Sequence, residues 1–402
     1  MDKRQKKILM LGGLRYLLPV IQAAHELGYY VITCDYLPDN IAHKYSDEYH
    51  NISIVDKDAV FSLAQKLQID GIMSFAVDPG VVTAAYVAEK LGLPGSPYES
   101  VKILQDKSLF RQFLTEFGFN TPFSKGYATE EEALATINEF SWPVIVKPVD
   151  SAGSKGVTRV DHIQHLSEAI RKARNHSASC RFIIEEFIEK KGYSSDSDAF
   201  SVNGELKYIS FSDQRFDANA VNPYTPAAFS WPSTMDYEYQ QELTTEIQRL
   251  LKLLNMGTSV YNIETCVDKN GKAYIMEVSP RGGGNRLSEM LRLATGVDLI
   301  KNSVRAAVGD EIADIREAEY NGYLGELILH VNESGVFDKI EIDNQLEKYV
   351  FELDVWVNKG DTVQPFAGAG GTLGTLVVQS KEREELTGFI DHIDQYVNVV
   401  VH

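Results

Sequence analysis

The stretch YNIETCVDKNGKAYIMEVSP predicts a β-hairpin that carries two glutamates, Glu264 and Glu277. A two-residue turn at Asn270-Gly271 would place these glutamates directly opposite each other on one face, because a strand has a period of two. Facing carboxylates repel each other unless a cation, a shared proton or open solvent relieves them. Mg²⁺ suits such a pair, since it takes one or two protein carboxylates and fills its shell with water and phosphate oxygens. The alternatives are an edge hairpin whose glutamates point into water, or a longer turn that places Glu264 opposite Ile275.

A second candidate site, for phosphate, lies in the stretch PVIVKPVDSAGSKGV. Lys147 stands near the end of an apolar strand, and the glycine-serine loop after it carries Lys155. Backbone amides, serine hydroxyls and a lysine are the donors that a phosphate cradle requires. The P-loop pattern GxxxxGK[ST] is absent from the sequence. A solvated turn is the alternative interpretation, and the nearby pair of carboxylates favours the phosphate site because metal ligands and phosphate donors work together.

The negative overall charge argues against nucleic acid and anionic membranes as partners. The 402 residues include 39 basic and 57 acidic side chains, a formal charge of −18, which predicts repulsion from nucleic acid and from anionic membranes. No apolar run reaches the roughly 18 residues that a membrane helix needs. Cys34, Cys180 and Cys266 show no paired metal spacing, so we expect buried thiols in a reduced, cytoplasmic protein. A phosphate ligand must therefore be held by a local basic pocket.

The elements that would position these residues follow from the hydrophobic pattern. Strand and helix patterns alternate through residues 8–95, which predicts a doubly wound parallel sheet with helices on both faces. The turn-rich segment GLPGSPYES marks a boundary, after which Asp106 is placed to cap a helix. The remaining expected elements are a strand-rich segment over about 121–160, helices over 163–174 and 239–254, a hairpin turned at Asn203-Gly204, and short strands with a last helix beyond 309. The fold class is therefore α/β, with an α+β central part.

Four motifs in order, LQDKSLFRQFL, PVIVKP with DSAGSKGV, FIIEEFIE, and the glutamate hairpin with its PRGGG ending, resemble the ATP-grasp superfamily. The resemblance is to its carboxylate–amine ligase branch, which includes carbamoyl-phosphate synthase and biotin carboxylase domains, purine-biosynthetic enzymes and amino-acid ligases. It implies a pre-ATP-grasp α/β domain over 1–97, and an ATP-grasp domain of two α+β lobes over 98–308 with a lid lobe over about 121–183. A small β-rich C-terminal domain over 309–402 completes the implied organisation.

The resemblance also implies a role for individual residues. Those expected to contact ATP are Lys107, Lys147, Ser151, Gly153, Ser154, Lys155, Gly156, and the hinge residues Glu185, Glu186, Phe187 and Ile188. Those expected to hold Mg²⁺, with Mn²⁺ as the alternative ion, are Glu264, Glu277 and Ser279, the last standing where the family pattern has asparagine. Arg281 and Lys147 are the expected catalytic residues.

The implied activity is an ATP-dependent C–N ligase that forms an acyl phosphate and then an amide, with small carboxylate and amine substrates. An amino-acid or peptide-type ligase is favoured over a formate- or bicarbonate-using enzyme, and a non-catalytic ATP-binding protein is the alternative from another class. Arg215 and Arg286 are candidates for clamping a second carboxylate, or else form structural ion pairs. No nucleic-acid or membrane partner is expected, and a homodimer is an expectation from the family alone.

Overall fold

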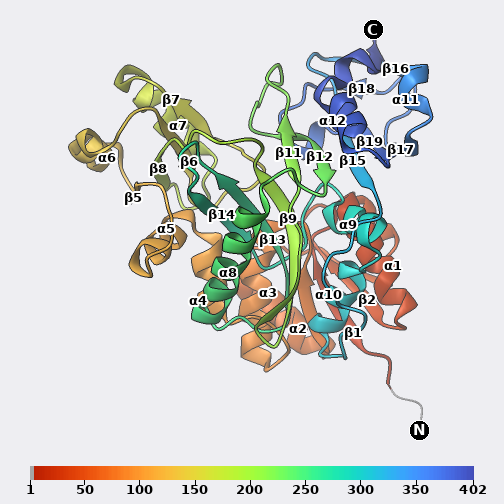
Figure 1. Ribbon diagram of the computed structural model, residues 1–402. Helices are drawn as coiled ribbons and strands as arrows, with labels where there is room; N and C mark the ends of the chain where they lie inside the picture. The colour runs from red at the N-terminus through yellow and green to blue at the C-terminus, as the bar shows by residue number, and fades with distance from the viewer. Residues whose placement is uncertain (1–3) are drawn as a thin grey trace.

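The computed structural model describes residues 4–402, and Figure 1 shows how its parts are arranged. The N-terminal sheet and its helices form the base, below the central strands. Two lobes rise from the base on opposite sides, a yellow one built from residues near 120–190 and a blue one at the C-terminal end. Within residues 4–402, no helix is long and apolar enough to span a bilayer.

The N-terminal part is a parallel sheet with helices on both faces, as predicted. The strands are β1 (Lys7–Leu11), β2 (Tyr30–Cys34), β3 (Glu48–His50) and β4 (Gly71–Ser74) in the order β3-β2-β1-β4, and the helices are α1 (Leu18–Glu26), α2 (Lys57–Leu67), α3 (Asp78–Leu91) and α10 (Leu299–Ala307). Ile8 and Met10 pack in one core with α1 and α10, whereas Leu9 and Leu11 pack in another with α2 and α3. Alternate side chains of β1 thus pack against the helices on opposite faces of the sheet.

The yellow lobe is a second, antiparallel sheet. Its elements are β5 (Ser124–Tyr127), α6 (Glu130–Thr136), β6 (Val144–Pro148), β7 (Thr158–Val160), α7 (Leu166–Asn175) and β8 (Phe182–Glu186), with the strands in the order β5-β8-β6-β7. Two helices, α4 (Tyr98–Gln105) and α5 (Lys107–Glu116), lead into it. The Asp106 carboxylate accepts the backbone N–H groups of Ser108 and Leu109, which confirms the predicted cap. The turn-rich segment predicted as a boundary contains the first turn of α4.

The central sheet has the order β10-β9-β13-β14. Its strands are β9 (Ser195–Val202), β10 (Glu205–Ile209), β13 (Ser259–Val267) and β14 (Ala273–Ser279), and α8 (Tyr237–Leu253) packs on it. The predicted hairpin turn at Asn203-Gly204 is confirmed, since both residues have left-handed φ angles of 52° and 78°.

The predicted two-residue turn at Asn270-Gly271 is wrong. The turn spans residues 268–272, because Val267 pairs with Ala273 and the Asp268 N–H donates to the Lys272 carbonyl. A β-bulge then shifts the register between the Glu264–Glu277 pair and the Thr265–Ile275 pair. The longer turn and the bulge compensate, so Glu264 faces Glu277 as predicted.

The C-terminal part contains two further sheets. A five-stranded sheet of order β11-β12-β15-β19-β17 joins β11 (Asp213–Phe216) and β12 (Pro226–Trp231) to β15 (Tyr323–Leu329), β17 (Val350–Val355) and β19 (Gly374–Ser380). The other sheet contains β18 (Thr362–Val363), β16 (Gly335–Ile342) and β20 (Val397–Val401). The remaining helices are α9 (Leu287–Thr295), α11 (Asn344–Glu347) and α12 (Arg383–Asp391), with short 3-10 helices at 15–17, 41–44, 137–139, 163–165, 369–371 and 393–395. The larger sheet therefore crosses the boundary predicted at 309, and the division into domains stays a prediction.

We expect Gly71→Ala to lower the free energy of unfolding by about 1–3 kcal/mol, because over-packing forces the backbone to shift. A Cβ at Gly71 would lie 2.2 Å from the Ala307 carbonyl oxygen at the end of α10. Gly388→Ala is the matched control, since it adds the same methyl on α12 where no atom lies within 4 Å. Thermal unfolding of both variants checks this, and an unchanged melting temperature for Gly71→Ala would contradict the tight packing.

Candidate active site

Six polar residues on three neighbouring strands share one face of the central sheet. Asn262 pairs with Asp198 on one side and Ser279 on the other, and Glu264 likewise lies between Asp196 and Glu277. Residues directly opposite each other point to the same side of a sheet. We call this set the acidic face: Asp196, Asp198, Asn262, Glu264, Glu277 and Ser279. The sequence predicted only the β13–β14 half of it, and no local signal linked β9 to that hairpin.

The acidic face carries more negative charge than its own hydrogen bonds relieve. The Asn262 amide donates to Asp196 at 2.6 Å and to Asp198 at 3.3 Å, and the Gly283 N–H donates to Asp198 at 2.9 Å. Burial raises the pKa of Asp196 to about 8, and the neighbouring Glu264 charge adds to this rise. Burial also raises the pKa of Asp198 to about 6. Without a cation, protons must take up part of this charge at neutral pH.

The donor set fits a hard cation that shares its shell with a ligand. Glu264 and Glu277 face each other and are only partly buried, so their oxygens are accessible. Among residues 4–402, no three His, Cys, Asp or Glu side chains form a complete cage for a metal. Mg²⁺ bound there would need water and phosphate oxygens for the rest of its shell, which is its usual preference. The Ser279 hydroxyl is already engaged, accepting from Gln105 at 2.8 Å and donating to Asp78 at 3.0 Å.

The two predicted lysines enter the site from different elements. Lys107, the first residue of α5, places its Nζ 3.2 Å from a Glu277 oxygen and donates to the Ser151 carbonyl at 3.0 Å. Burial alone would lower the pKa of Lys107, but the charges of Glu277 and Asp78 outweigh it and raise the pKa. Lys107 therefore stays charged and connects the acidic face to the glycine loop.

Lys147 is held by a buried ion pair that the sequence did not predict. Its Nζ lies 2.7 Å from one Glu185 oxygen, and the Arg111 Nε lies 2.8 Å from the other. Glu185 is 2% exposed, and although burial opposes it, the charges of Arg111 and Lys147 lower its pKa to about 2. Burial lowers the pKa of Lys147, which Glu185 only partly offsets. Glu185, expected as a hinge residue, thus uses its side chain to position the lysine.

The other hinge residues follow at the end of β8. The Glu186 N–H donates to the Phe123 carbonyl at 2.9 Å, and the Phe187 N–H donates to the Pro143 carbonyl at 3.0 Å. Arg159 stacks over the Phe187 ring, with 4.4 Å between its guanidinium carbon and the ring centroid. These bonds fix the chain direction where Ile188 leaves the lobe.

The glycine loop is tied to a distant segment of the chain. Gly153, Ser154 and Gly156 all have left-handed φ angles, between 56° and 75°, a conformation that favours glycine. The Ser154 hydroxyl donates to the Tyr224 carbonyl at 2.8 Å, and the Asn222 amide donates to the Ser154 carbonyl at 3.1 Å. Lys155 is exposed. The loop is therefore ordered by the segment before β12.

Asn222 also reaches the C-terminal lobe. Its backbone N–H donates to the Phe366 carbonyl at 3.4 Å, and its side-chain amide approaches the Ala367 carbonyl at 3.5 Å. A single side chain thus bridges the glycine loop and the loop after β18.

Arg281 is fixed by a carboxylate from the N-terminal part. Its Nε and Nη2 donate to the two oxygens of Asp78, at 2.9 and 2.7 Å, and its Nη1 donates to Asn262 at 3.2 Å. Burial raises the pKa of Asp78, but the Arg281 charge outweighs this and the pKa falls below its usual value. A bidentate pair of this kind sets the plane of the guanidinium. Asp78 lies at the start of α3, just beyond the end of a parallel strand, where ligand-binding residues are common in α/β sheets.

The two candidate substrate arginines are already paired with protein carboxylates. Arg215 has its Nε 2.5 Å from Asp391 and its guanidinium 4.2 Å from the centre of the Tyr193 ring. This arrangement matches the structural ion pair that was the alternative for Arg215. Arg286 has its Nη1 2.6 Å from a Glu352 oxygen.

Comparison with known proteins places this geometry in a family. Residues 140–289 match the ATP-grasp domain family. The chain carries an ATP-grasp domain. The matched range includes Lys147, the glycine loop, the hinge and the glutamate hairpin, whereas Lys107 and Asp78 of the site lie outside it.

Relatives of the ATP-grasp domain and its flanking parts cover most of the chain. The carbamoyl phosphate synthase large chain of Thermotoga petrophila is 24% identical over 301 residues, which is 74% of this chain and 27% of that protein. The chain thus spans about a quarter of the length of the curated relatives it matches. An L-amino acid ligase from Bacillus licheniformis has a TM-score of 0.81 at 22% identity, covering 100% of both chains. Phosphoribosylglycinamide synthetase from Anaerococcus prevotii has a TM-score of 0.77 at 21% identity, covering 99% of this chain and 100% of that one. These structural likenesses show that the whole chain shares its fold with those two proteins.

We expect Glu185→Gln to lower the free energy of unfolding by about 3–5 kcal/mol at pH 7, because it leaves Arg111 and Lys147 as buried, uncompensated cations. The folded pKa of Glu185, about 2, lies below the unfolded value of about 4.3. Its stabilisation is therefore complete above the unfolded pKa and is lost as the pH falls toward 2. Melting curves from pH 7 to pH 2 should show the gap between wild type and variant closing.

Glu139→Gln is the control for that experiment. Glu139 pairs with Lys125 at 2.7 Å, but both side chains are about a third exposed or more, so the effect should stay below about 1 kcal/mol. Equal destabilisation by the two variants would contradict the structural role of Glu185.

Proposed function

We propose that this chain is an ATP-dependent carboxylate–amine ligase. The observation that carries the proposal is the facing of Glu264 and Glu277 within reach of Lys107, beside the glycine loop. Two carboxylates suited to a hard cation, next to a lysine and a loop of backbone donors, are the groups that binding of a nucleoside triphosphate with its metal ion requires. The similarity to a carbamoyl phosphate synthase large chain and the fold shared with an L-amino acid ligase support it.

Each part of the site has a proposed task. Glu264 and Glu277 hold Mg²⁺, or Mn²⁺, which when bound neutralises the triphosphate charge. Lys107 and Lys147 bind phosphate oxygens, and the loop over 151–156 covers them with its backbone N–H groups. The hinge over 185–188 contacts the adenine edge.

The proposed reaction is activation of a carboxylate by phosphorylation. A substrate carboxylate oxygen forms a bond to the γ-phosphorus of ATP, and the bond between that phosphorus and the oxygen that leaves with ADP breaks. The product is an acyl phosphate. The amine nitrogen then bonds to the acyl carbon, the bond from that carbon to the phosphate oxygen breaks, and the nitrogen loses a proton to solvent. Arg281, held in plane by Asp78, faces the charge that develops on the transferring group. The closed glycine loop excludes the water that would hydrolyse the intermediate.

The substrates we favour are an amino acid or peptide and an amine. A bicarbonate-using reaction is the second candidate, on the similarity to carbamoyl phosphate synthase. We place the protein in the cytoplasm, because its three cysteines are free, as suits a reducing compartment. Cys34 and Cys266 are buried as expected, whereas the expectation of a buried thiol is wrong for Cys180, which is exposed. A homodimer stays a prediction from the resemblance.

Hydroxylamine, used as a general amine, tests the reaction class. We expect Mg-ATP, excess hydroxylamine and a mixed pool of amino acids and bicarbonate to give ADP and an equal amount of trapped product, because an acyl phosphate reacts with any strong nucleophile. The trapped product is a hydroxamate if an amino acid is activated and N-hydroxycarbamate if bicarbonate is activated. ATP binding with no ADP from any acid in the pool would favour a non-catalytic ATP-binding protein. Splitting the pool then separates amino acids from bicarbonate.

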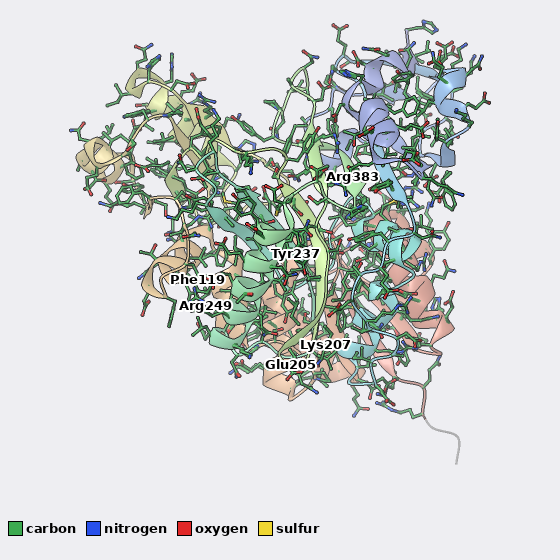
Figure 2. All side chains as sticks on the ribbon, viewed as in Figure 1. Phe119, Glu205, Lys207, Tyr237, Arg249 and Arg383 are labelled. Carbon is green, nitrogen blue, oxygen red and sulfur yellow. The ribbon has the colours of Figure 1, made fainter. Side chains whose placement is uncertain are left out.

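We expect Glu277→Gln to lower kcat for ADP release by about 100-fold or more, because it removes one of the two facing carboxylates and the partner of Lys107. Glu205→Gln is the matched control: Glu205 pairs with Lys207 at 2.6 Å, and Figure 2 labels both at the far end of the central sheet, away from the yellow lobe. Turnover that survives Glu277→Gln would refute the proposed metal site.

A further inference from the structure

Ser279 lies on the acidic face, but it is much less accessible than the glutamate beside it. It is 1% exposed, whereas the side chain of Glu277, on the same face of β14, is 33% exposed. A magnesium or manganese ion bound here would share its shell with water and phosphate oxygens, which requires ligands that face the open site. Glu277 meets this requirement, and Ser279 does not.

The Ser279 hydroxyl instead joins two groups from other parts of the chain. Its oxygen accepts from the Gln105 amide at 2.8 Å, and its proton is donated to a carboxylate oxygen of Asp78 at 3.0 Å. A hydroxyl has one proton and two lone pairs. The proton and one lone pair of Ser279 are therefore used within the protein, and a single lone pair is left for any metal ion.

Asp78 connects Ser279 to Arg281. The carboxylate oxygen that accepts from Ser279 also accepts from the Arg281 Nε at 2.9 Å, and the second oxygen accepts from Nη2 at 2.7 Å. The bond from Ser279 thus fixes the rotation of the Asp78 carboxylate, and the carboxylate fixes the plane of the guanidinium. The side chains of Asp78 and Arg281 are 17% and 9% exposed, so water competes little for these bonds.

Packing alone does not hold Arg281 in place. It lines a cavity of about 80 Å³ between α3, α10 and the start of β13, with Ser74, Val81 and Ala307 among the other lining residues. A void offers no atoms for van der Waals contact on that side. The position of the guanidinium therefore depends on its hydrogen bonds, and Asp78 accepts two of them, including the shortest.

Gln105 anchors the other end of this chain of hydrogen bonds. It is the last residue of α4, a helix that packs against both α3 and β14. Two residues later, Lys107 reaches Glu277, so the junction of α4 and α5 contacts β14 at both Glu277 and Ser279. The segment that carries a proposed phosphate-binding lysine therefore also fixes Ser279.

We infer that Gln105, Ser279 and Asp78 form a positioning chain for Arg281, and that the two facing glutamates are the only protein ligands of the proposed metal ion. The inference rests on the proposed ligase function and replaces the expected metal-binding role of Ser279. The members of the positioning chain act through Arg281, which faces the transferring phosphoryl group in the proposed reaction. No bond is made or broken at any of the three.

Binding of Mn²⁺ in the presence of ADP, followed by the electron paramagnetic resonance of the free ion, tests the metal assignment without turnover. We expect Ser279→Ala to keep the Mn²⁺ affinity within about twofold, whereas Glu277→Gln should lower it about tenfold or more, because affinity follows the charge of the ligands. Equal losses in the two variants would make Ser279 a metal ligand and overturn the inference.

Turnover with the hydroxylamine assay tests the positioning role. We expect Asp78→Asn and Ser279→Ala each to lower kcat for ADP release about tenfold or more, with KM for ATP changed less than about threefold, because Arg281 acts on the transferring group. Ser279→Thr keeps the hydroxyl and should recover most of the loss. Ser62→Ala, which removes an exposed hydroxyl on α2, is the matched control and should keep both constants.

A double-mutant cycle separates positioning from a general loss of structure. Arg281→Lys keeps the charge but cannot form the paired hydrogen bonds with Asp78. Adding Asp78→Asn to it should therefore lower kcat by less than about twofold more. Losses that multiply in full, at an unchanged melting temperature, would show that Asp78 acts independently of Arg281 and would refute the positioning chain.

Failure of this inference and failure of the ligase function give different results. ADP release that neither Asp78→Asn nor Ser279→Ala changes would leave the ligase function standing and remove the positioning chain. Wild-type protein that releases no ADP with any acid would remove the ligase function and the positioning role with it. The Mn²⁺ affinities would still decide whether Ser279 belongs to the metal site.

Discussion

The site is dominated by the repulsion among four carboxylates that share one face of three strands. Asp196, Asp198, Glu264 and Glu277 cannot all be charged in a partly buried setting without compensation. The compensation comes from outside the sheet, with Lys107 from α5 and Arg281 from the loop after β14. The helices and loops that supply these cations are thereby held against the sheet, and the same charge is what the proposed divalent cation would neutralise.

The cations in turn connect parts of the chain that are far apart in sequence. Arg281 forms an ion pair with the Asp78 carboxylate of the N-terminal part. Lys147 and Arg111 both form ion pairs with the buried Glu185. Each link is a charge pair at low exposure, where removal of one partner costs more than the pair contributes. The parallel sheet is therefore part of the candidate site, since Asp78 sets the orientation of Arg281.

The sequence predicts what depends on local pattern. The period of two in β1, the Asp106 cap and the Asn203-Gly204 turn all follow from neighbouring residues and are confirmed. The facing of Glu264 and Glu277 was reached through a turn that is wrong, and a β-bulge restores the pairing. Bulges have weak sequence signals, so the bulge could not be predicted. The predicted pairing is right because the bulge offsets the register shift that the longer turn introduces.

What the sequence does not predict depends on contacts between distant segments. Asp196 and Asp198 join the acidic face only because β9 pairs with β13, and β12 pairs with β15 across the predicted domain boundary. The short strand β3 was likewise not expected, since three residues carry too little pattern to reveal a strand.

The bridge made by Asn222 gives the glycine loop a mechanical property of its own. Its amide holds the Ser154 carbonyl, and its backbone N–H holds the Phe366 carbonyl of the C-terminal lobe. Lifting the loop would therefore strain or release the contact with that lobe, so the free energy of opening the loop includes a contribution from the C-terminal lobe. Under the proposed function, the rate at which ADP leaves would then respond to packing around Phe366, and variation in that lobe would tune the dwell time of ADP while the residues proposed to bind phosphate stay the same.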